Sequence, residues 1–330
     1  MSAPAPVLRS VRISSLLRDR TALLTVLILI TSVVMSFLSP YFLVLDNLLA
    51  MTQFGAVIGL LALGQTLVIF AGGGGIDLSV GAMLSLCGVL MGLVVGQGVN
   101  VWLAAAIVLA IGLVLGALNG VAVTVVGIPA LIATLGTLYL FGSAAQVLAA
   151  GAEAGGFDQS GFRVLGTGTV LGIPTQVLFV LLPVYAFAAW VMRRSLFGRR
   201  VYEVGNNERA ARLVGTSPPR IRFTLYCVSG ALAGLGAVVT NSWLLVARPG
   251  AGEGFELQSI TIAVLGGAHI FGGRGRVSGT LLAVLLIVIL GSGLQLAGVD
   301  PSWQAGVLGI VLVLAVVLNN AFTRGSGKRA

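Results

Sequence analysis

The chain carries few residues that could perform covalent or metal chemistry. It has one histidine, His269, and two cysteines, Cys87 and Cys227, and all three lie within or beside apolar segments. It contains no HExxH, CxxC or GxSxG pattern, so neither a metal centre nor a nucleophile with its base is indicated. Gly325-Ser326-Gly327-Lys328 resembles the end of a phosphate-binding loop, but Phe322 stands where that pattern requires glycine. We therefore predict a chain that is not an enzyme and holds no metal or cofactor.

A second feature is a short polar helix predicted within the stretch NNERAARLVG, residues 206–215. Asparagine supplies its N-cap, Glu208 complements the positive N-terminal dipole, and Arg212 suits the last turn. Gly215 allows a left-handed end, and Pro218–Pro219 would prevent the helix from continuing. A helix this short is marginal in water, so it packs either on its own protein or on a soluble partner. The residues leave both alternatives open.

The elements that position these residues are predicted from the distribution of charge. Of the 330 residues, 57% are hydrophobic and 9% are charged, whereas globular chains carry about 25% charged residues. No charged residue occurs between Asp46 and Asp77, or between Asp77 and Glu153. Apolar runs of this length indicate membrane spans. The net charge of +9 could suggest nucleic acid, but the basic residues lie in short loops, so we expect no nucleic-acid partner.

The predicted fold class is all-α, a polytopic bundle of transmembrane helices. Dividing the apolar regions at glycine, proline, asparagine and charged residues gives about ten spans. The expected spans are 21–38, 48–70, 80–96, 101–126, 129–150, 175–192, 223–246, 257–270, 277–297 and 303–321. Spans 80–96 and 257–270 are short and flanked by glycine, which predicts tilted, broken or partial crossings.

The loop 193–222 sets the expected topology. It contains eight arginines and two glutamates, so it should be cytoplasmic. With six spans before it and four after, both termini are also cytoplasmic. The chain then divides into a tail (1–20), a transmembrane domain (21–322) and a second tail (323–330), without a cleavable signal peptide. The residues expected outside are Glu153, Asp158, Glu253 and Glu256.

Polar residues inside the spans are few, and chains of ionisable groups for proton coupling are absent from the sequence. Asp77 and His269 are the exceptions. We expect Asp77 to cap a helix that begins near Leu78, and His269 to have a packing role. Uncharged polar residues at membrane depth either line a passage for a hydroxyl-rich solute or join helix to helix; they are Gln65, Thr66, Asn119, Thr134, Thr137 and Gln295.

Glycines recur at four-residue spacing in two spans. Gly112, Gly116 and Gly120 share one helix face, and Gly230 and Gly234 share another. Small residues at this spacing let two helix backbones approach closely, so we predict tight helix packing at these faces.

Three segments resemble the permease subunits of bacterial ABC importers, in the branch that handles ribose, other monosaccharides and autoinducer-2. They are GGIDLSVG at 74–81, VGNNERAARLVG at 204–215 and AVLGGAHIFGGRGRVSGT at 263–280, and GLQLAGV at 293–299 continues the match. The signature positions are Gly74, Gly75, Asp77, Ser79, Gly81, Gly266, Gly267, Gly272 and Gly273. Arg209 and His269 depart from the pattern of the family.

The resemblance implies a function and a set of partners. Two permease chains would enclose a path across the bacterial inner membrane, a solute-binding protein would deliver solute outside, and ABC ATPase subunits would bind inside and hold the ATP. The coupling contact with the ATPase would fall on Glu208, Ala210, Ala211 and Gly215. The path would draw on Gln65, Asn119, Thr134, Thr137 and Gln295. The solute would be a sugar or a similar small polar molecule.

Three alternatives remain open at this point. The first is import of autoinducer-2 by a permease of the same family. The second is an ion-coupled secondary transporter, which the scarcity of ionisable residues in the spans disfavours. The third is a membrane scaffold without transport, which ATP-dependent uptake by a reconstituted complex would exclude.

Overall fold

The computed structural model describes residues 20–150, 155–158 and 161–300, together with single positions between 303 and 317. In chain order the elements are α2 (Arg20–Leu38), α3 (Leu45–Phe70), α4 (Val80–Gly96), α5 (Val101–Thr124), α6 (Ala130–Ala149), α7 (Phe162–Thr167), β1 (Thr169–Val170), β2 (Ile173–Pro174), η1 (Val177–Leu181), α8 (Leu182–Arg194), α9 (Leu196–Asn206), α10 (Glu208–Leu213), α11 (Pro218–Leu244), α12 (Phe255–Leu265) and α13 (Val277–Leu296). The two strands form only a small antiparallel hairpin, so the fold is all-α as predicted.

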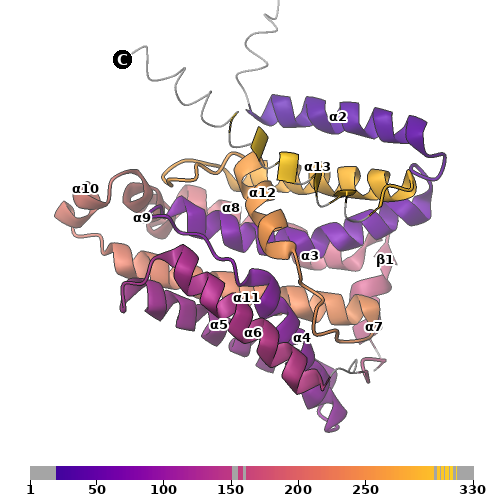
Figure 1. Ribbon diagram of the computed structural model, residues 1–330, viewed down its shortest axis with the longest axis horizontal. Coiled ribbons are helices and arrows are strands. Elements are labelled where there is room, and N and C mark those ends of the chain that lie inside the picture. Colours follow the sequence, from indigo (N-terminus) through magenta and orange to yellow (C-terminus); the bar gives the residue numbers. More distant parts are fainter. Residues whose placement is uncertain are drawn as a thin grey trace, which may run out of the picture.

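The long helices run lengthwise through the molecule around α3 (Figure 1). α3 packs against α11, α12 and α13, and 89% of the residues in its most apolar 18-residue stretch are buried. α2 packs on α13 at the edge of the bundle, and only 11% of the residues in the corresponding stretch of α2 are buried. An apolar helix that leaves most of its surface uncovered requires an apolar solvent, so α2 is a lipid-facing span.

Seven helices of the described chain are long and apolar enough to cross a membrane, which confirms a polytopic membrane protein. α4 and α12 are apolar but have 17 and 11 residues, fewer than the roughly 20 that a full crossing needs. Nine of the nineteen residues of the tenth expected span, 303–321, lie outside the described residues, as do Glu153, the N-terminal tail before Arg20 and the tail 323–330.

Two of the observed helix starts differ from the expected ones. α11 begins at Pro218, so Pro218 and Pro219 open this helix rather than only ending the one before it. Proline is favoured in the first turn because the N–H groups there have no partner within the helix. The span expected over 175–192 begins as a π-helix, η1, and becomes α-helical at Leu182, next to Pro183. Proline lacks the N–H that a regular ladder requires, which accounts for the change.

The two glycine faces pack tightly, as predicted, and the structure shows that they pack against each other. A side chain on Gly112 would overlap the carbonyl oxygen of Gly230, and one on Gly116 would overlap that of Tyr226. α5 and α11 form the most extensive helix pair of the described structure. Without side chains at these positions the two backbones approach closely, and this fixes α11 for the polar contacts described next.

Candidate functional site

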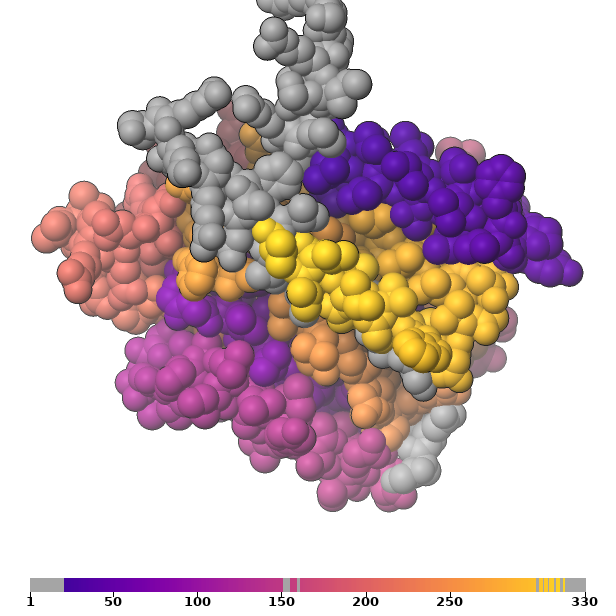
Figure 2. Space-filling model, turned by 45° about the horizontal axis from the view of Figure 1, so that its top comes forward, coloured from indigo at the N-terminus to yellow at the C-terminus, as the bar shows by residue number. Residues whose placement is uncertain are grey.

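The short helix predicted in the loop 193–222 is present as α10 and is capped as expected. The side chain of Asn207 accepts a hydrogen bond from the Ala210 N–H at 3.1 Å, which satisfies one of the free donors of the first turn. Gly215 has φ of 79°, the left-handed conformation that favours glycine. Figure 2 shows this part of the chain, in salmon, projecting from one edge of the molecule.

Glu208 pairs with two arginines, Arg212 within α10 and Arg222 on α11, and the second pair joins α10 to the bundle. Arg212 Nη2 lies 2.7 Å from Glu208 Oε1, and Arg222 Nη2 lies 2.7 Å from Glu208 Oε2. The Arg212 side chain is 57% exposed, whereas that of Arg222 is 17% exposed. Hydrogen bonds first from Arg212 and then from Arg222 hold the pKa of the Glu208 carboxyl below its ordinary value, although partial burial opposes them. The carboxylate therefore stays ionised and paired at neutral pH.

Arg222 continues the connection from α10 to the loop that follows α3. Its guanidinium packs on the backbone of Gly73 so closely that a side chain at Gly73 would overlap it. Nη2 of Arg222 also lies 3.5 Å from the carbonyl oxygen of Ala71, to which it donates. Arg222 thus touches α10 on one side and the end of α3 on the other.

Three separate segments meet at this point without side chains between them. Gly273 donates its backbone N–H to the carbonyl oxygen of Phe70 at 3.0 Å. A side chain on Gly205 would overlap both Phe70 and Gly273, and one on Gly272 would overlap Gly72. We call Phe70, Gly72, Gly205, Gly272 and Gly273 the glycine junction. It connects the end of α3, the end of α9 and the loop before α13 through direct backbone contacts.

The loop leaving the glycine junction leads to Asp77, which is fully buried. Its carboxylate accepts hydrogen bonds from the Ser79 N–H at 3.0 Å, the Ser79 hydroxyl at 2.7 Å and the Ser229 hydroxyl of α11 at 3.0 Å. The Asn119 amide lies 3.5 Å from it and donates to the Ser79 hydroxyl at 2.7 Å. A buried carboxylate needs such donors. Asp77 therefore binds the start of α4 to α5 and α11.

Asp77 fulfils the predicted capping role only in part. It accepts the N–H of Ser79, one residue before α4 begins at Val80, and its side chain makes no bond to an N–H within α4. The bond forms a turn that leads into the helix, which is a common use of aspartate at this place.

Four of the six residues considered for a passage, Gln65, Asn119, Thr134 and Thr137, belong to this buried network. The Gln65 side chain accepts from the Asp77 N–H at 3.3 Å, and Thr137 donates to the side-chain oxygen Oδ1 of Asn119 at 2.7 Å. Thr134 lies 3.3 Å from the backbone carbonyl oxygen of Ile76. Their contacts join helix to helix, the second of the two roles weighed from the sequence. Gln295 is separate, because it lies exposed near the end of α13.

The signature glycines divide between the glycine junction and two other close contacts. Gly266 packs against the backbone of Thr280 where α12 leads toward α13, and Gly81 packs against Gly252 at the start of α4. Gly74 has φ of 71° with no atom near its missing side chain, and Gly267 has φ of 97°, so conformation explains these two. A side chain on Gly75 would lie 2.9 Å from the carbonyl oxygen of Val68.

Of the four residues expected to contact an ATPase, Ala210 and Gly215 are exposed, Glu208 is half-buried and Ala211 is buried at 2%. Ala211 therefore packs within its own chain. The structure adds three residues that sequence reasoning did not single out: Arg222, which was counted only as loop charge, and Leu213 and Val214, which are 89% and 73% exposed. Two adjacent apolar residues at the end of the predicted short polar helix would have been the available signal.

These features define a class: a polytopic α-helical membrane protein with a short helix on one loop, connected to the loop after α3 and the loop before α13. Residues 47–316 match the family described as branched-chain amino acid transport system / permease component. The chain belongs to that family of permease components.

Several characterised relatives extend over nearly the whole chain. The ribose import permease protein RbsC of Escherichia coli K12 is 38% identical over 308 residues, 92% of this chain and 94% of that protein. RbsC of Bacillus subtilis 168 is 38% identical over 290 residues, 87% and 88% of the two chains. The autoinducer 2 import system permease protein LsrD of Enterobacter sp. 638 is 36% identical over 301 residues, 89% and 91%. No solved structure matches the chain significantly.

Proposed function

We propose that the chain is the membrane-spanning subunit of an ATP-driven importer and carries a sugar or a similar small polar solute across the bacterial inner membrane. The observation that supports it most is the connection from α10 through Glu208 and Arg222 to the glycine junction. A soluble ATPase that moves α10 would thereby move the turns before α4 and α13. The relatives named for ribose and autoinducer 2 import support a hydroxyl-rich solute.

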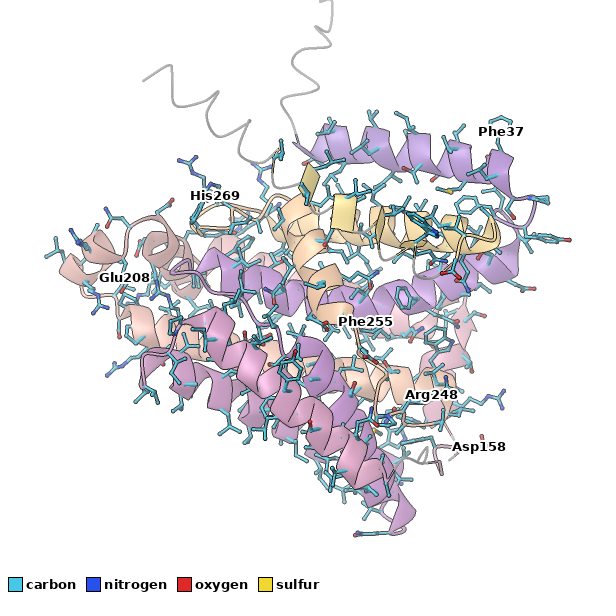
Figure 3. All side chains as sticks on the ribbon, viewed as in Figure 1. Phe37, Asp158, Glu208, Arg248, Phe255 and His269 are labelled. Carbon is cyan, nitrogen blue, oxygen red and sulfur yellow. The ribbon has the colours of Figure 1, made fainter. Side chains whose placement is uncertain are left out.

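The end of the molecule that bears α10 is the proposed cytoplasmic end. Arginines gather there on α8 to α11 and on the loop before α13, as expected for cytoplasmic segments. Glu208 and His269 lie toward this end, while Asp158 and Arg248 lie at the other (Figure 3). With about ten spans, both termini would be cytoplasmic. Outside, a solute-binding protein would deliver the solute, and a second permease chain would complete the path.

The ATPase would bind the exposed tip of α10. Leu213 and Val214 present apolar surface there, outside the membrane-spanning helices, next to the exposed Ala210 and Gly215. Burial of two such side chains in a groove is worth about 1.5–3 kcal/mol each. Glu208 and Ala211 would hold this tip in place rather than provide the contact surface. ATP hydrolysis would belong to the partner.

The test is a double substitution at the tip, Leu213→Asp with Val214→Asp. We expect the ATPase subunit, expressed with the chain, no longer to copurify, and ATP-dependent uptake of D-ribose into proteoliposomes to be lost. Leu171→Asp is the matched control, because Leu171 is 97% exposed in the hairpin between β1 and β2. ATPase binding that survives the double substitution would contradict the docking site, and D-ribose uptake without any ATPase would contradict ATP-driven import.

A further inference from the structure

A pocket of about 390 Å³ lies between α3, α11, α12 and α13. Its walls come from the N-terminal part of α3, the C-terminal ends of α11 and α13 and the second turn of α12. The contributing ends of α3, α11 and α13 lie away from α10, toward the proposed outer end of the molecule, and α12 stands nearer the middle (Figure 1). The pocket has the volume of small-molecule sites, which are commonly about 300–1,000 Å³.

The walls of the pocket are largely apolar, with rings and uncharged polar groups set among aliphatic side chains such as those of Met51, Ile287 and Leu290. Phe54 and Trp243 contribute rings, Asn47, Gln258, Gln295 and Gln304 contribute amides, and none of the lining residues is charged. Rings offer flat apolar faces to the C–H surface of a small molecule, while amides both donate and accept hydrogen bonds. This combination suits a neutral molecule with many hydroxyl groups and does not suit an ion.

Two of the amides differ from the others in having no partner. Asn47 donates to the Phe42 carbonyl oxygen at 2.7 Å and accepts from Ser292 at 2.8 Å, and Gln304 donates to the Val299 carbonyl oxygen at 2.8 Å. Within the described part of the chain, the side chains of Gln258 and Gln295 make no hydrogen bond. Asn47 and Gln304 therefore shape the pocket, whereas the amides of the half-buried Gln258 and the exposed Gln295 are accessible to a ligand.

The position of Gln258 adds an independent argument. Gln258 lies on α12, which is too short to cross a membrane. The segment that leads into α12 contacts the start of α4: Gly252 packs against Gly81 and donates its N–H to the Ser85 hydroxyl at 2.9 Å. In secondary transporters, short and interrupted helices commonly supply the solute site. Phe255 on the same helix packs edge to face on Phe54 at 5.7 Å, which fixes one ring of the pocket.

We propose that this pocket is the site where the solute enters the permease from outside, with Gln258 and Gln295 as its hydrogen-bonding residues and Phe54 and Trp243 as its ring walls. The proposal rests on the proposed function for its solute class, a neutral polyhydroxylated molecule, and adds the site. It also separates Gln295 from Gln65, Asn119, Thr134 and Thr137, whose hydrogen bonds stay within the protein.

The first experiment uses D-ribose as the probe and the complete transporter in proteoliposomes. Gln258→Leu combined with Gln295→Leu should lower the maximal uptake rate about tenfold, since two neutral hydrogen bonds are lost. Gln97→Leu is the matched control, because Gln97 is an exposed amide at the C-terminal end of α4, outside the pocket. Gln258→Asn with Gln295→Asn should recover part of the rate. The melting temperature and ATPase binding should remain unchanged, which excludes misfolding.

The second experiment needs no transport. Gln295→Cys should react from outside with a membrane-impermeant maleimide, and D-ribose at high concentration should slow the reaction. An acyl chain of lipid in the pocket would instead prevent labelling, and that result would overturn the site even if the wild-type transporter imports D-ribose. Unchanged uptake by the double leucine variant would also overturn it. Absence of D-ribose import by the wild type, with labelling intact but unprotected, would instead count against the proposed solute.

Discussion

The two ends of the molecule are built on opposite principles. At the end that bears α10, the backbones of Phe70, Gly205 and Gly273 touch, and Glu208 is held by two arginines. At the other end, a pocket of about 390 Å³ lies open among four helices, and two of its amides have no partner in the described chain. The end that bears α10 is closely packed and has many fixed contacts. The other end has open volume and amides without a partner in the described chain.

Close packing at one end and open volume at the other are what a transport subunit driven by another protein requires. A movement received at one end is transmitted only through contacts that cannot yield, and closely packed backbone satisfies this condition. A solute is received only where space and unused polar groups remain. The buried network around Asp77 lies between these two regions and joins α4, α5 and α11.

The largest effect is expected from Asp77→Ala, which breaks the network between the two ends. The hydroxyls of Ser79 and Ser229 and the N–H of Ser79 would lose their acceptor inside the bundle. Leaving buried donors unpaired costs about 1–3 kcal/mol each, so we expect the melting temperature of the purified chain to fall by about 10 °C or more. Asp77→Asn, which keeps one acceptor oxygen, should lose less. Equal melting temperatures for both variants would show that the carboxylate is not the organising group.

A smaller effect on folding but a complete loss of uptake is expected from Gly205→Val. The new side chain would overlap the backbone of Phe70 and Gly273, which has no flexible end to move aside. Overpacking of this kind costs about 1–3 kcal/mol. ATP-dependent D-ribose uptake measures the result, and Gly136→Val is the control, because Gly136 lies within helix α6 with no atom near its missing side chain. Normal uptake by Gly205→Val would remove the glycine junction from the transmission.

The two arginines of Glu208 provide a sharper comparison within one end. Arg222→Gln removes the contact to both Glu208 and the loop at Ala71 and Gly73, so uptake should fall about tenfold while ATP hydrolysis continues. Arg212→Gln removes an exposed pair worth about 0–1 kcal/mol and should change uptake less than about threefold. The ratio of solute imported to ATP hydrolysed distinguishes the two. Equal ratios would mean that Arg222 is only another surface charge.

The sequence predicted where each helix lies along the chain better than it predicted which residues of different helices meet. Charge-free runs located α2 to α6 and α11 to α13 within a few residues, because burial in lipid excludes charge from each span separately. The glycine faces of α5 and α11 were also predicted, since their spacing is local. The meeting of Gly72, Gly205 and Gly272 was not, because it depends on long-range packing. The roles of Gln65 and Asn119 stayed open for the same reason: a polar residue at membrane depth does not itself reveal what faces it.

The smallest effect is expected from pH, and it tests whether the α10 end is fixed under ordinary conditions. The pKa of Glu208 is lowered from the model-compound value of 4.5, principally by its hydrogen bond from Arg212. A group with a depressed pKa in the folded state contributes its full stability above the unfolded value and loses it only as the pH falls through the lower, folded value. The difference in melting temperature between the wild type and Glu208→Gln should therefore stay constant from about pH 7.5 to about pH 5.5 and shrink only below about pH 4.5. A difference that already shrinks at about pH 6 would mean that Glu208 is not held by its arginines, and the rigid connection from α10 to the glycine junction would fail at its first contact.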